Sequence, residues 1–268
     1  MRALTTHHPK CLVKVAGRPL LEWQIDALRA AGVGEFAVVR GYCASALSGP
    51  GYTPFDNPRW SETNMVGSLL TADAWLRGGE CIVSYGDILY HPSAAQALSA
   101  STADIAITYD RLWKQLWSDR FEDPLSDAET FRRSADGFLQ EIGHRASSLA
   151  EVEGQYMGLL KFTPAGWDQI KRFLSGVAPS DLDRLDMTGL LSGLLGAGVR
   201  IAAIPVEGRW CEVDSDADLE LYTERLEQVI PWRHDWRWET AEPERRVLCA
   251  WRPPKKKAAP AYAGRLRA

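Results

Sequence analysis

Hydrophobic and polar positions follow two rhythms along this chain, one typical of buried strands and one typical of amphipathic helices. Short apolar runs that end in polar residues predict strands at 35–42, 80–87, 104–110, 156–162 and 199–206. Apolar positions three or four residues apart predict helices at 20–31, 92–101, 164–174 and 180–195. Because strands and helices alternate, the pattern predicts right-handed crossovers and a mostly parallel sheet flanked by helices, which is an α/β fold.

Two polar segments precede further predicted helices. Thr63 and Asn64 follow a polar loop broken by proline, and they stand at the start of a helix that runs to Leu76. The stretch "RWCEVD" is extended and turns into a helix at Ser215, where Asp218 completes a capping-box pattern.

The middle and the end of the chain differ in composition from the rest. Residues 111–155 are rich in Trp, Asp and Glu with one clear strand at 137–143, so we expect a lid inserted over the sheet. From residue 231 the chain turns to Trp, Arg and Pro and ends "KKKAAPAYAGRLRA", which predicts a domain of residues 1–230 and a loosely ordered basic tail of residues 231–268. A solvated terminus is the simplest interpretation of the tail, and contact with nucleic acid is the less favoured one.

The overall composition narrows the class of protein. With 268 residues, of which 46% are hydrophobic, the chain can bury one large core. A net charge of -4 gives no general attraction to nucleic acid or to an anionic membrane. No apolar stretch has the length of a membrane span or of a signal-peptide core, and the five cysteines form no C-x-x-C pair. We therefore expect a soluble cytoplasmic protein with reduced, mostly buried thiols.

Two aspartates follow extended segments at places where ligands bind in α/β folds. Asp87 ends the predicted strand at 80–87, and Asp214 ends the stretch "RWCEVD". Ligands of open α/β sheets lie beyond the carboxyl ends of the strands, and two carboxylates with open coordination positions suit Mg²⁺. The alternative is that both aspartates have a structural role, because aspartate is also common in turns and at helix caps.

Lys10 and Asn64 can likewise be interpreted either as ligand contacts or as residues without a functional role. Lys10 follows a proline in a loop, where its ammonium could reach a phosphate or simply be solvated. The Asn64 amide both donates and accepts hydrogen bonds, which reading a base edge requires, but it could equally cap its own helix.

Aromatic and acidic residues gather in the predicted lid and near residue 210. They suit a cation pocket formed by ring faces and carboxylates, with Trp113, Trp117, Glu129, Trp210 and Glu212 as its candidates. Choline would use the rings, whereas a primary ammonium would depend more on the carboxylates. The alternative is an acidic surface lid whose tryptophans pack on the sheet.

Four segments together resemble one enzyme family. The segment "HHPKCLVKVAGRPLLEWQIDALRAAGV" is similar to the region after the phosphate loop of sugar-phosphate-type nucleotidyltransferases. The segments "FDNPRWSETNMVGSL", "VSYGDILY" and "WCEVDSDADL" resemble the phosphocholine and phosphonate cytidylyltransferase branch. The resemblance implies a Rossmann-like nucleotidyltransferase fold. It also implies Mg²⁺-dependent transfer of CMP from CTP to phosphocholine, 2-aminoethylphosphonate or a similar acceptor, with release of pyrophosphate.

The resemblance also implies roles for matching residues. Asp87 and Asp214 would bind Mg²⁺, and Lys10 would stabilise phosphate charge. Asn64, Ser68 and Gly86 would lie near the nucleotide, and Tyr156 near the acceptor.

The chain departs from the family at its start. Members begin with a buried strand and a glycine-rich loop that cradles the triphosphate, and Met1 stands just after the position of that loop. We therefore expect either a native chain that extends upstream or a protein without this cradle. The alternatives to a cytidylyltransferase are a sugar-1-phosphate nucleotidylyltransferase and a catalytically silent binding or regulatory homologue. A homodimer is compatible with all of them.

Overall fold

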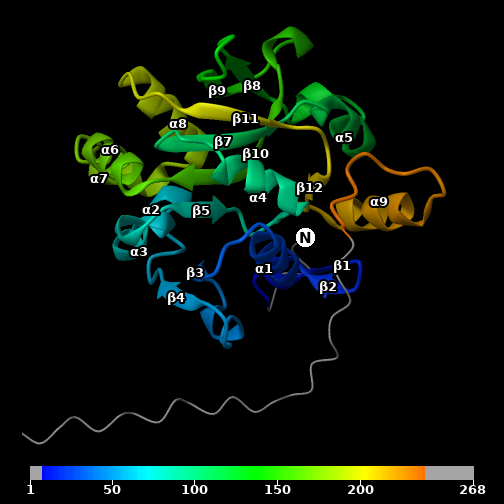
Figure 1. Ribbon diagram of the computed structural model, residues 1–268, viewed down its shortest axis with the longest axis horizontal. Helices are drawn as coiled ribbons and strands as arrows, with labels where there is room; N and C mark the ends of the chain where they lie inside the picture. The colour runs from blue at the N-terminus through cyan, green and yellow to red at the C-terminus, as the bar shows by residue number, and fades with distance from the viewer. Residues whose placement is uncertain (1–7, 239–268) are drawn as a thin grey trace, which may run out of the picture. The chain divides into compact units, whose positions relative to one another are not determined.

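The computed structural model describes residues 8–238, shown as a coloured ribbon in Figure 1. The chain divides into a compact unit that ends at Trp238 and a second unit, residues 239–268, outside the described part. None of the helices in residues 8–238 combines the length and the apolar character needed to cross a bilayer. Of the five cysteines, Cys11, Cys43, Cys81 and Cys211 lie in the described part as free thiols; only Cys211 is fully buried, so "mostly buried" was wrong.

A four-stranded sheet forms the centre of the compact unit (Figure 1). Its strands are β11 (Ala202–Val206), β7 (Ile105–Asp110), β10 (Gln155–Phe162) and β5 (Cys81–Ser84), in that spatial order. β11 is parallel to β7, whereas β10 is antiparallel to both β7 and β5. The sheet is therefore mixed: β5, β7 and β11 share one direction, whereas β10 is reversed because the insertion leaves β7 at Asp110 and re-enters beside it at Gln155.

The remaining strands of the described part form four two-stranded sheets. They are β1 (Lys14–Val15) with β2 (Arg18–Pro19), β3 (Ala37–Arg40) with β4 (Thr53–Asp56), β6 (Ile88–Tyr90) with β12 (Trp210–Glu212), and β8 (Glu129–Arg133) with β9 (Leu139–Arg145). Within residues 8–238, β5 has a strand partner only on the β10 side.

The helices agree with the apolar spacing, except where a cap or a turn divides them. They are α1 (Leu20–Ala30), α2 (Met65–Leu70), α3 (Asp73–Gly78), α4 (Pro92–Ser99), α5 (Trp113–Arg120), α6 (Pro164–Leu174), α7 (Pro179–Arg184), α8 (Met187–Gly196) and α9 (Asp216–Glu227). Short 3-10 turns are η1 (Lys10–Leu12), η2 (Ala44–Ala46), η3 (Pro124–Ser126) and η4 (Leu149–Glu151). The single helix predicted at 180–195 is two helices, because the Asp186 carboxylate accepts from the Gly189 amide and starts α8. The helix predicted from residue 64 to Leu76 is likewise divided, into α2 and α3.

Alternating residues of the sheet build a core on each face. Ala106 of β7 belongs to the core that α1 and α4 cover, whereas its neighbours Ile105 and Ile107 belong to the core that α6 and α8 cover. This period of two is the geometry of a strand buried on both faces, as the continuous apolar run predicted.

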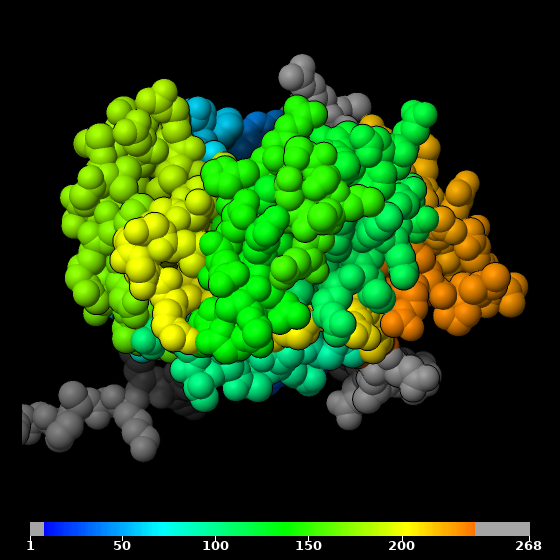
Figure 2. Space-filling model, turned by 90° about the horizontal axis from the view of Figure 1, so that it is seen from above, coloured from blue at the N-terminus to red at the C-terminus, as the bar shows by residue number. Residues whose placement is uncertain are grey.

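The insertion after β7 contains more regular structure than the one predicted strand. It holds α5 and the antiparallel hairpin of β8 and β9. Seen from above, its green surface lies between α6–α8, in yellow-green and yellow, and α9, in orange (Figure 2). The inserted lid is therefore a folded layer of the domain.

Residues 231–238 belong to the compact unit, so the predicted boundary after residue 230 lies too early. The side chains of His234 and Trp236 are fully buried, and His234 Nε2 lies 2.9 Å from Asp110 Oδ2. Burial of a large indole stabilises a domain, which explains why this Trp-rich segment packs on it. The remainder of the predicted tail, residues 239–268, lies outside the described residues.

Candidate active site

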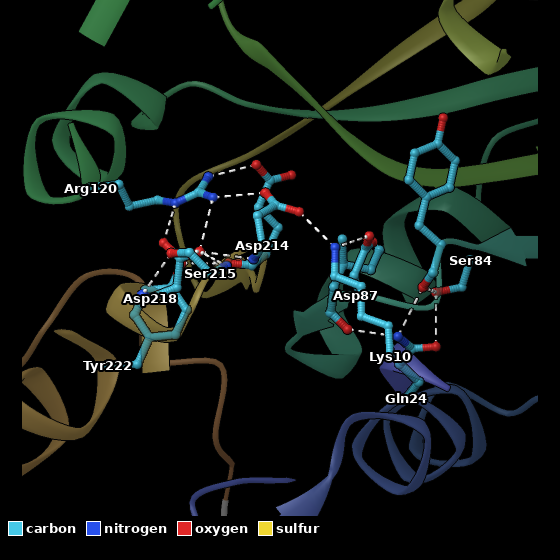
Figure 3. A network of polar contacts seen from close by, with 12 residues as sticks. Lys10, Gln24, Ser84, Asp87, Arg120, Asp214, Ser215, Asp218 and Tyr222 are labelled. Atoms are coloured by element: carbon cyan, nitrogen blue, oxygen red, sulfur yellow. Dashed lines mark hydrogen bonds and ion pairs between the residues drawn. The ribbon is translucent and has the colours of Figure 1, made fainter. Parts of the chain in front are cut away.

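The three residues that the sequence proposes for catalysis meet at one place. The backbone of Val213 donates to the Asp87 carbonyl at 2.9 Å, because β12 pairs with β6 directly after Asp87. This pairing sets Asp87 beside Asp214. The Lys10 ammonium, on η1, donates to Asp87 Oδ2 and to Asp214 Oδ1, each at 2.7 Å (Figure 3).

Arg120 at the end of α5 is a second cation of the site, and sequence analysis missed it. Its guanidinium donates to Glu212 at 2.6 Å, to Asp214 at 2.8 Å and to Asp218 at 2.9 Å (Figure 3). Its side chain is 1% exposed. We call the residues joined by Lys10 and Arg120 the paired cluster: Lys10, Asp87, Arg120, Glu212, Asp214 and Asp218.

Burial and ion pairing oppose each other in the paired cluster. Burial lowers the pKa of Lys10, but Asp87 and Asp214 outweigh it and hold that pKa above its ordinary value. Burial raises the pKa of Asp214, but Lys10 and Arg120 hold it below the ordinary value. Burial raises the pKa of the Glu212 carboxyl, and Arg120 opposes that shift. Lys10 is therefore charged, and Asp214 is ionised, at neutral pH.

Gln24 of α1 positions the turn that carries Asp87. Its Nε2 donates to the carbonyl of Tyr85 at 2.9 Å and to that of Ile88 at 2.8 Å (Figure 3). Gly86, between them, is exposed, and a side chain there would meet the Cβ of Cys11 at 3.6 Å. In the sequence, Gln24 is distinguished as a polar residue on the otherwise apolar face of the helix predicted at 20–31.

Asn64 and Ser68, predicted to lie near the nucleotide, make their side-chain hydrogen bonds outside this cluster. The Asn64 side chain accepts from the Met65 amide and donates to the Arg184 carbonyl, so it caps α2. Ser68 Oγ accepts from Asn57 Nδ2 at 3.0 Å. Within residues 8–238 neither side chain bonds to the paired cluster.

The tryptophans proposed for the acceptor are core residues. Trp113 is 5% exposed, and Trp117 and Trp210 are fully buried with their ring centroids 6.1 Å apart. Their ring faces are closed to a ligand. The predicted cation pocket is therefore wrong for these three tryptophans, which pack in the core as the alternative interpretation predicted. Glu212, another acceptor candidate, is bound to Arg120 as described.

Glu129 and Tyr156 remain as acceptor candidates. Glu129 begins β8 and is half-buried, whereas Tyr156 on β10 is 8% exposed. The Tyr156 ring meets that of Tyr85 edge to face, with centroids 5.8 Å apart. Tyr85 stands two positions before Asp87, so Tyr156 contacts the segment that leads to the paired cluster.

Two curated relatives are similar to this chain. It is 32% identical over 240 residues to the CTP:phosphoglutamine cytidylyltransferase of Campylobacter jejuni, covering 83% of this chain and 94% of that protein. It is 27% identical to the CMP-5'-(3-aminopropyl)phosphonate synthase of Streptomyces rubellomurinus, of which it covers only 35%.

Solved structures share the fold. The inositol-1-phosphate CTP transferase from T. maritima is 18% identical with a TM-score of 0.65, over 84% of this chain and 90% of that one. The CTP:phosphocholine cytidylyltransferase from Streptococcus pneumoniae is 18% identical with a TM-score of 0.62, over 84% and 93%. The MobA-like NTP transferase domain family matches residues 2–144. The chain therefore belongs to the MobA-like NTP transferase domain family and is an enzyme of the nucleotidyltransferase class.

Proposed function

We propose that this enzyme transfers CMP from CTP to a phosphate or phosphonate oxygen of a small acceptor and releases pyrophosphate. The observation that carries the proposal is the convergence of Lys10, Asp87 and Asp214 at 2.7 Å in a chain whose relatives are named for CTP. In the reaction an acceptor oxygen attacks the α-phosphorus in line, and the bond from that phosphorus to the bridging oxygen breaks. Both electrons of that bond leave with pyrophosphate, so no covalent enzyme intermediate is needed.

The donor set of Asp87 and Asp214 fits Mg²⁺. The two carboxylates already share one cation in Lys10, and carboxylate oxygens are preferred ligands of this ion. No group of three or more His, Cys, Asp or Glu among the described residues is spaced to hold a metal, so substrate phosphates and water would complete the coordination. Bound there, Mg²⁺ would neutralise phosphate charge and polarise the reacting phosphorus.

The chain's own residues would supply alignment and further charge. The raised pKa of Lys10 keeps its ammonium protonated, so it can bind a phosphate oxygen when the carboxylates turn to the metal. Arg120, buried and bound to Asp214, would hold that carboxylate in position. Gln24 would fix the turn before Asp87. These contacts exist before substrate binds, which is the condition for electrostatic preorganisation.

A pyrophosphate-release assay tests the proposal. Each NTP is combined with phosphocholine, 2-aminoethylphosphonate and glucose-1-phosphate, with Mg²⁺ or with EDTA, on the chain as printed and on a chain extended upstream. We expect release with CTP and a phosphocholine-like or phosphonate acceptor, only with Mg²⁺. Preference for glucose-1-phosphate would favour a sugar nucleotidylyltransferase, and silence of both chains would favour a silent binding homologue.

A further inference from the structure

A cavity of about 620 Å³ lies between α5, α9 and the segment that follows α9, and we call it the α5–α9 cavity. In Figure 1 that segment, in orange, passes beside α5. The volume falls within the range of pockets that bind small molecules, roughly 300–1,000 Å³. None of the described residues that line the cavity belongs to the paired cluster, so the cavity is separate from the candidate active site.

Cations dominate the wall of the α5–α9 cavity. The described residues with charged side chains that line it are Arg111, Lys114, Asp119, Arg225 and Arg233. The chain as a whole carries a net charge of -4, so this positive wall runs against the average charge of the protein. A concave surface with charges of one sign concentrates ligands of the opposite sign. The cavity is therefore suited to an anion.

Two of these cations are available to a ligand. Lys114 forms no ion pair within residues 8–238, and Arg233 reaches Glu207 only at 4.0 Å. Both side chains are exposed. Arg111 pairs with the same Glu207 at 3.3 Å, and both partners are more than half exposed. Exposed pairs contribute little to stability, so these cations can turn to an anionic ligand at little cost.

A buried imidazole lines the same cavity. The His234 side chain is 1% exposed, and its Nε2 lies 2.9 Å from Asp110 Oδ2. An ionised carboxylate only accepts hydrogen bonds, so beside ionised Asp110 the hydrogen lies on Nε2. The other ring nitrogen, Nδ1, has no hydrogen-bond partner within the described residues. A buried polar atom without a partner costs stability, so a ligand that bonds to Nδ1 would restore that loss.

The cavity also has an apolar wall, formed by Ile230, Pro231 and Trp232. Ile230 is 78% exposed. Trp232 is held in place, because its Nε1 donates to Asp119 at 3.2 Å and its ring centroid lies 5.4 Å from that of Tyr222. Covering exposed apolar surface is favourable, so an anion with an organic part would gain more here than an inorganic ion.

The α5–α9 cavity shares its two helices with the paired cluster. α5 carries Asp119 at the cavity and Arg120 in the cluster, and α9 carries Arg225 and Asp218 in the same way. One ion pair joins Asp119 to Arg225, and another joins Arg120 to Asp218 at 2.9 Å. A ligand in the cavity would therefore contact the two helices that hold Arg120 in position.

We propose that the α5–α9 cavity binds a small organic phosphate, at a site separate from the active site. This site goes beyond the transfer of CMP and does not depend on it. A phosphate monoester carries roughly two negative charges at neutral pH, which several cations match better than they match a single carboxylate. Its oxygens would accept from Lys114, from Arg233 and, when the ring is protonated, from His234 Nδ1. Its organic part would cover Ile230.

Phenyl phosphate, which joins a phosphate to an apolar ring, tests the proposal. Its binding to the full chain is measured by ligand-observed NMR at low salt and compared with that of inorganic phosphate. EDTA is present, so that Mg²⁺ does not draw either compound to Asp87 and Asp214. We expect phenyl phosphate to bind several-fold more tightly than inorganic phosphate and to weaken as salt is added.

Three variants locate the bound compound. Lys114→Gln and Arg233→Gln should each weaken phenyl phosphate about tenfold, as the loss of one charge-assisted hydrogen bond predicts. Ile230→Ser should bring its affinity close to that of inorganic phosphate. Arg172→Gln, on the exposed surface of α6, removes the same charge elsewhere and is the matched control. All four side chains are exposed, so we expect folded variants, which circular dichroism checks.

The outcomes decide the proposal without any measurement of turnover. Losses confined to the three cavity variants support it, even if the pyrophosphate assay is silent, and that silence would count against the proposed function alone. Absence of binding, or equal affinity in the wild type and the cavity variants, overturns it. Equal affinity for the two compounds would indicate an unselective positive surface. Displacement of phenyl phosphate by far lower concentrations of a short oligonucleotide would indicate a nucleic-acid surface, and either result also overturns the proposal.

Discussion

Two acidic regions of this enzyme differ in how their charge is balanced. The paired cluster holds its carboxylates on Lys10 and Arg120 at 2.6 to 2.9 Å. The second region, which we call the unpaired acidic group, is formed by Asp127, Glu129 and Asp186. Within residues 8–238 none of the three forms an ion pair with lysine or arginine, and the only basic residues that act electrostatically on Asp127 and Glu129 are Arg120 and His144. The first region is organised before any ligand arrives. In the second region Asp186 and Asp127 raise the pKa of Glu129, so the ionised carboxylates repel one another.

This difference predicts opposite effects of removing charge. In the paired cluster, loss of one partner leaves other buried charges uncompensated and destabilises the fold. In the unpaired acidic group, loss of one carboxylate relieves repulsion.

Arg120→Met gives the largest expected effect on stability. It leaves Glu212, Asp214 and Asp218 without their shared cation, and we expect a loss of about 3–5 kcal/mol in the free energy of unfolding. Urea denaturation followed by circular dichroism measures it. The matched control is Arg111→Met, whose exposed pair with Glu207 at 3.3 Å should cost at most about 1 kcal/mol. Equal losses in the two variants would contradict the prediction, because Arg120 would then contribute no more to stability than an arginine in an exposed ion pair.

Asp87→Asn separates catalysis from stability in the same cluster. Asparagine keeps the shape of Asp87 but not the charge that the proposed Mg²⁺ and Lys10 would use, so kcat should fall roughly 10²–10³-fold, the scale of one lost electrostatic contact. Pyrophosphate release under saturating Mg²⁺ measures it, with Asp168→Asn as control. Unchanged turnover in a folded variant would remove Asp87 from the metal site.

Glu129→Gln should stabilise the free protein, in contrast to Arg120→Met. Because burial, Asp186 and Asp127 raise the pKa of Glu129, its ionised form costs stability above that pKa, and the cost disappears as pH falls through it. We expect a gain of up to about 1 kcal/mol at pH 8 and little gain at pH 5. Thermal unfolding at both pH values measures it. Destabilisation at pH 8 would mean that Glu129 has a favourable partner.

Features encoded by local spacing could be predicted from the sequence. The capping box of Ser215 and Asp218 is present, and the predicted helix at 164–174 is α6 (Pro164–Leu174). Asp87 and Asp214 could be placed near one another because extended segments that end at the same edge of a sheet bring their last residues together. Each of these inferences needs only neighbouring residues or a general rule of sheet topology.

Features that depend on distant packing could not be predicted in this way. Arg120 binds carboxylates 92 to 98 positions away, so no local pattern identifies it. Two errors did have a local signal. Trp113, Leu116 and Trp117 follow helical spacing, which indicates the buried face of α5. His234 and Trp236 are buried and alternate with less buried neighbours, the period of an extended segment that packs on a core.

The pH dependence of acceptor binding gives the smallest effect and the finest test of the comparison. The groups that act on Glu129 are Asp127 and Asp186, which raise its pKa with burial, and His144, which lowers it. Because Glu129 protonates at a higher pH than an ordinary glutamate, a contact of this candidate acceptor residue with the ammonium of an acceptor such as phosphoethanolamine should weaken a few-fold as pH falls from 8 towards 5.

The Glu129→Gln variant isolates this titration from others in the same range. The acceptor phosphate also gains a proton near pH 6, but it does so with both proteins, so the ratio of wild-type to variant affinity cancels its contribution. That ratio should be largest at pH 8 and approach one as the wild-type carboxyl becomes neutral, because a neutral Glu129 and a glutamine hold an ammonium similarly. A ratio independent of pH would mean that Glu129 stays ionised beside Asp186, and the repulsion that distinguishes the two regions would then be absent.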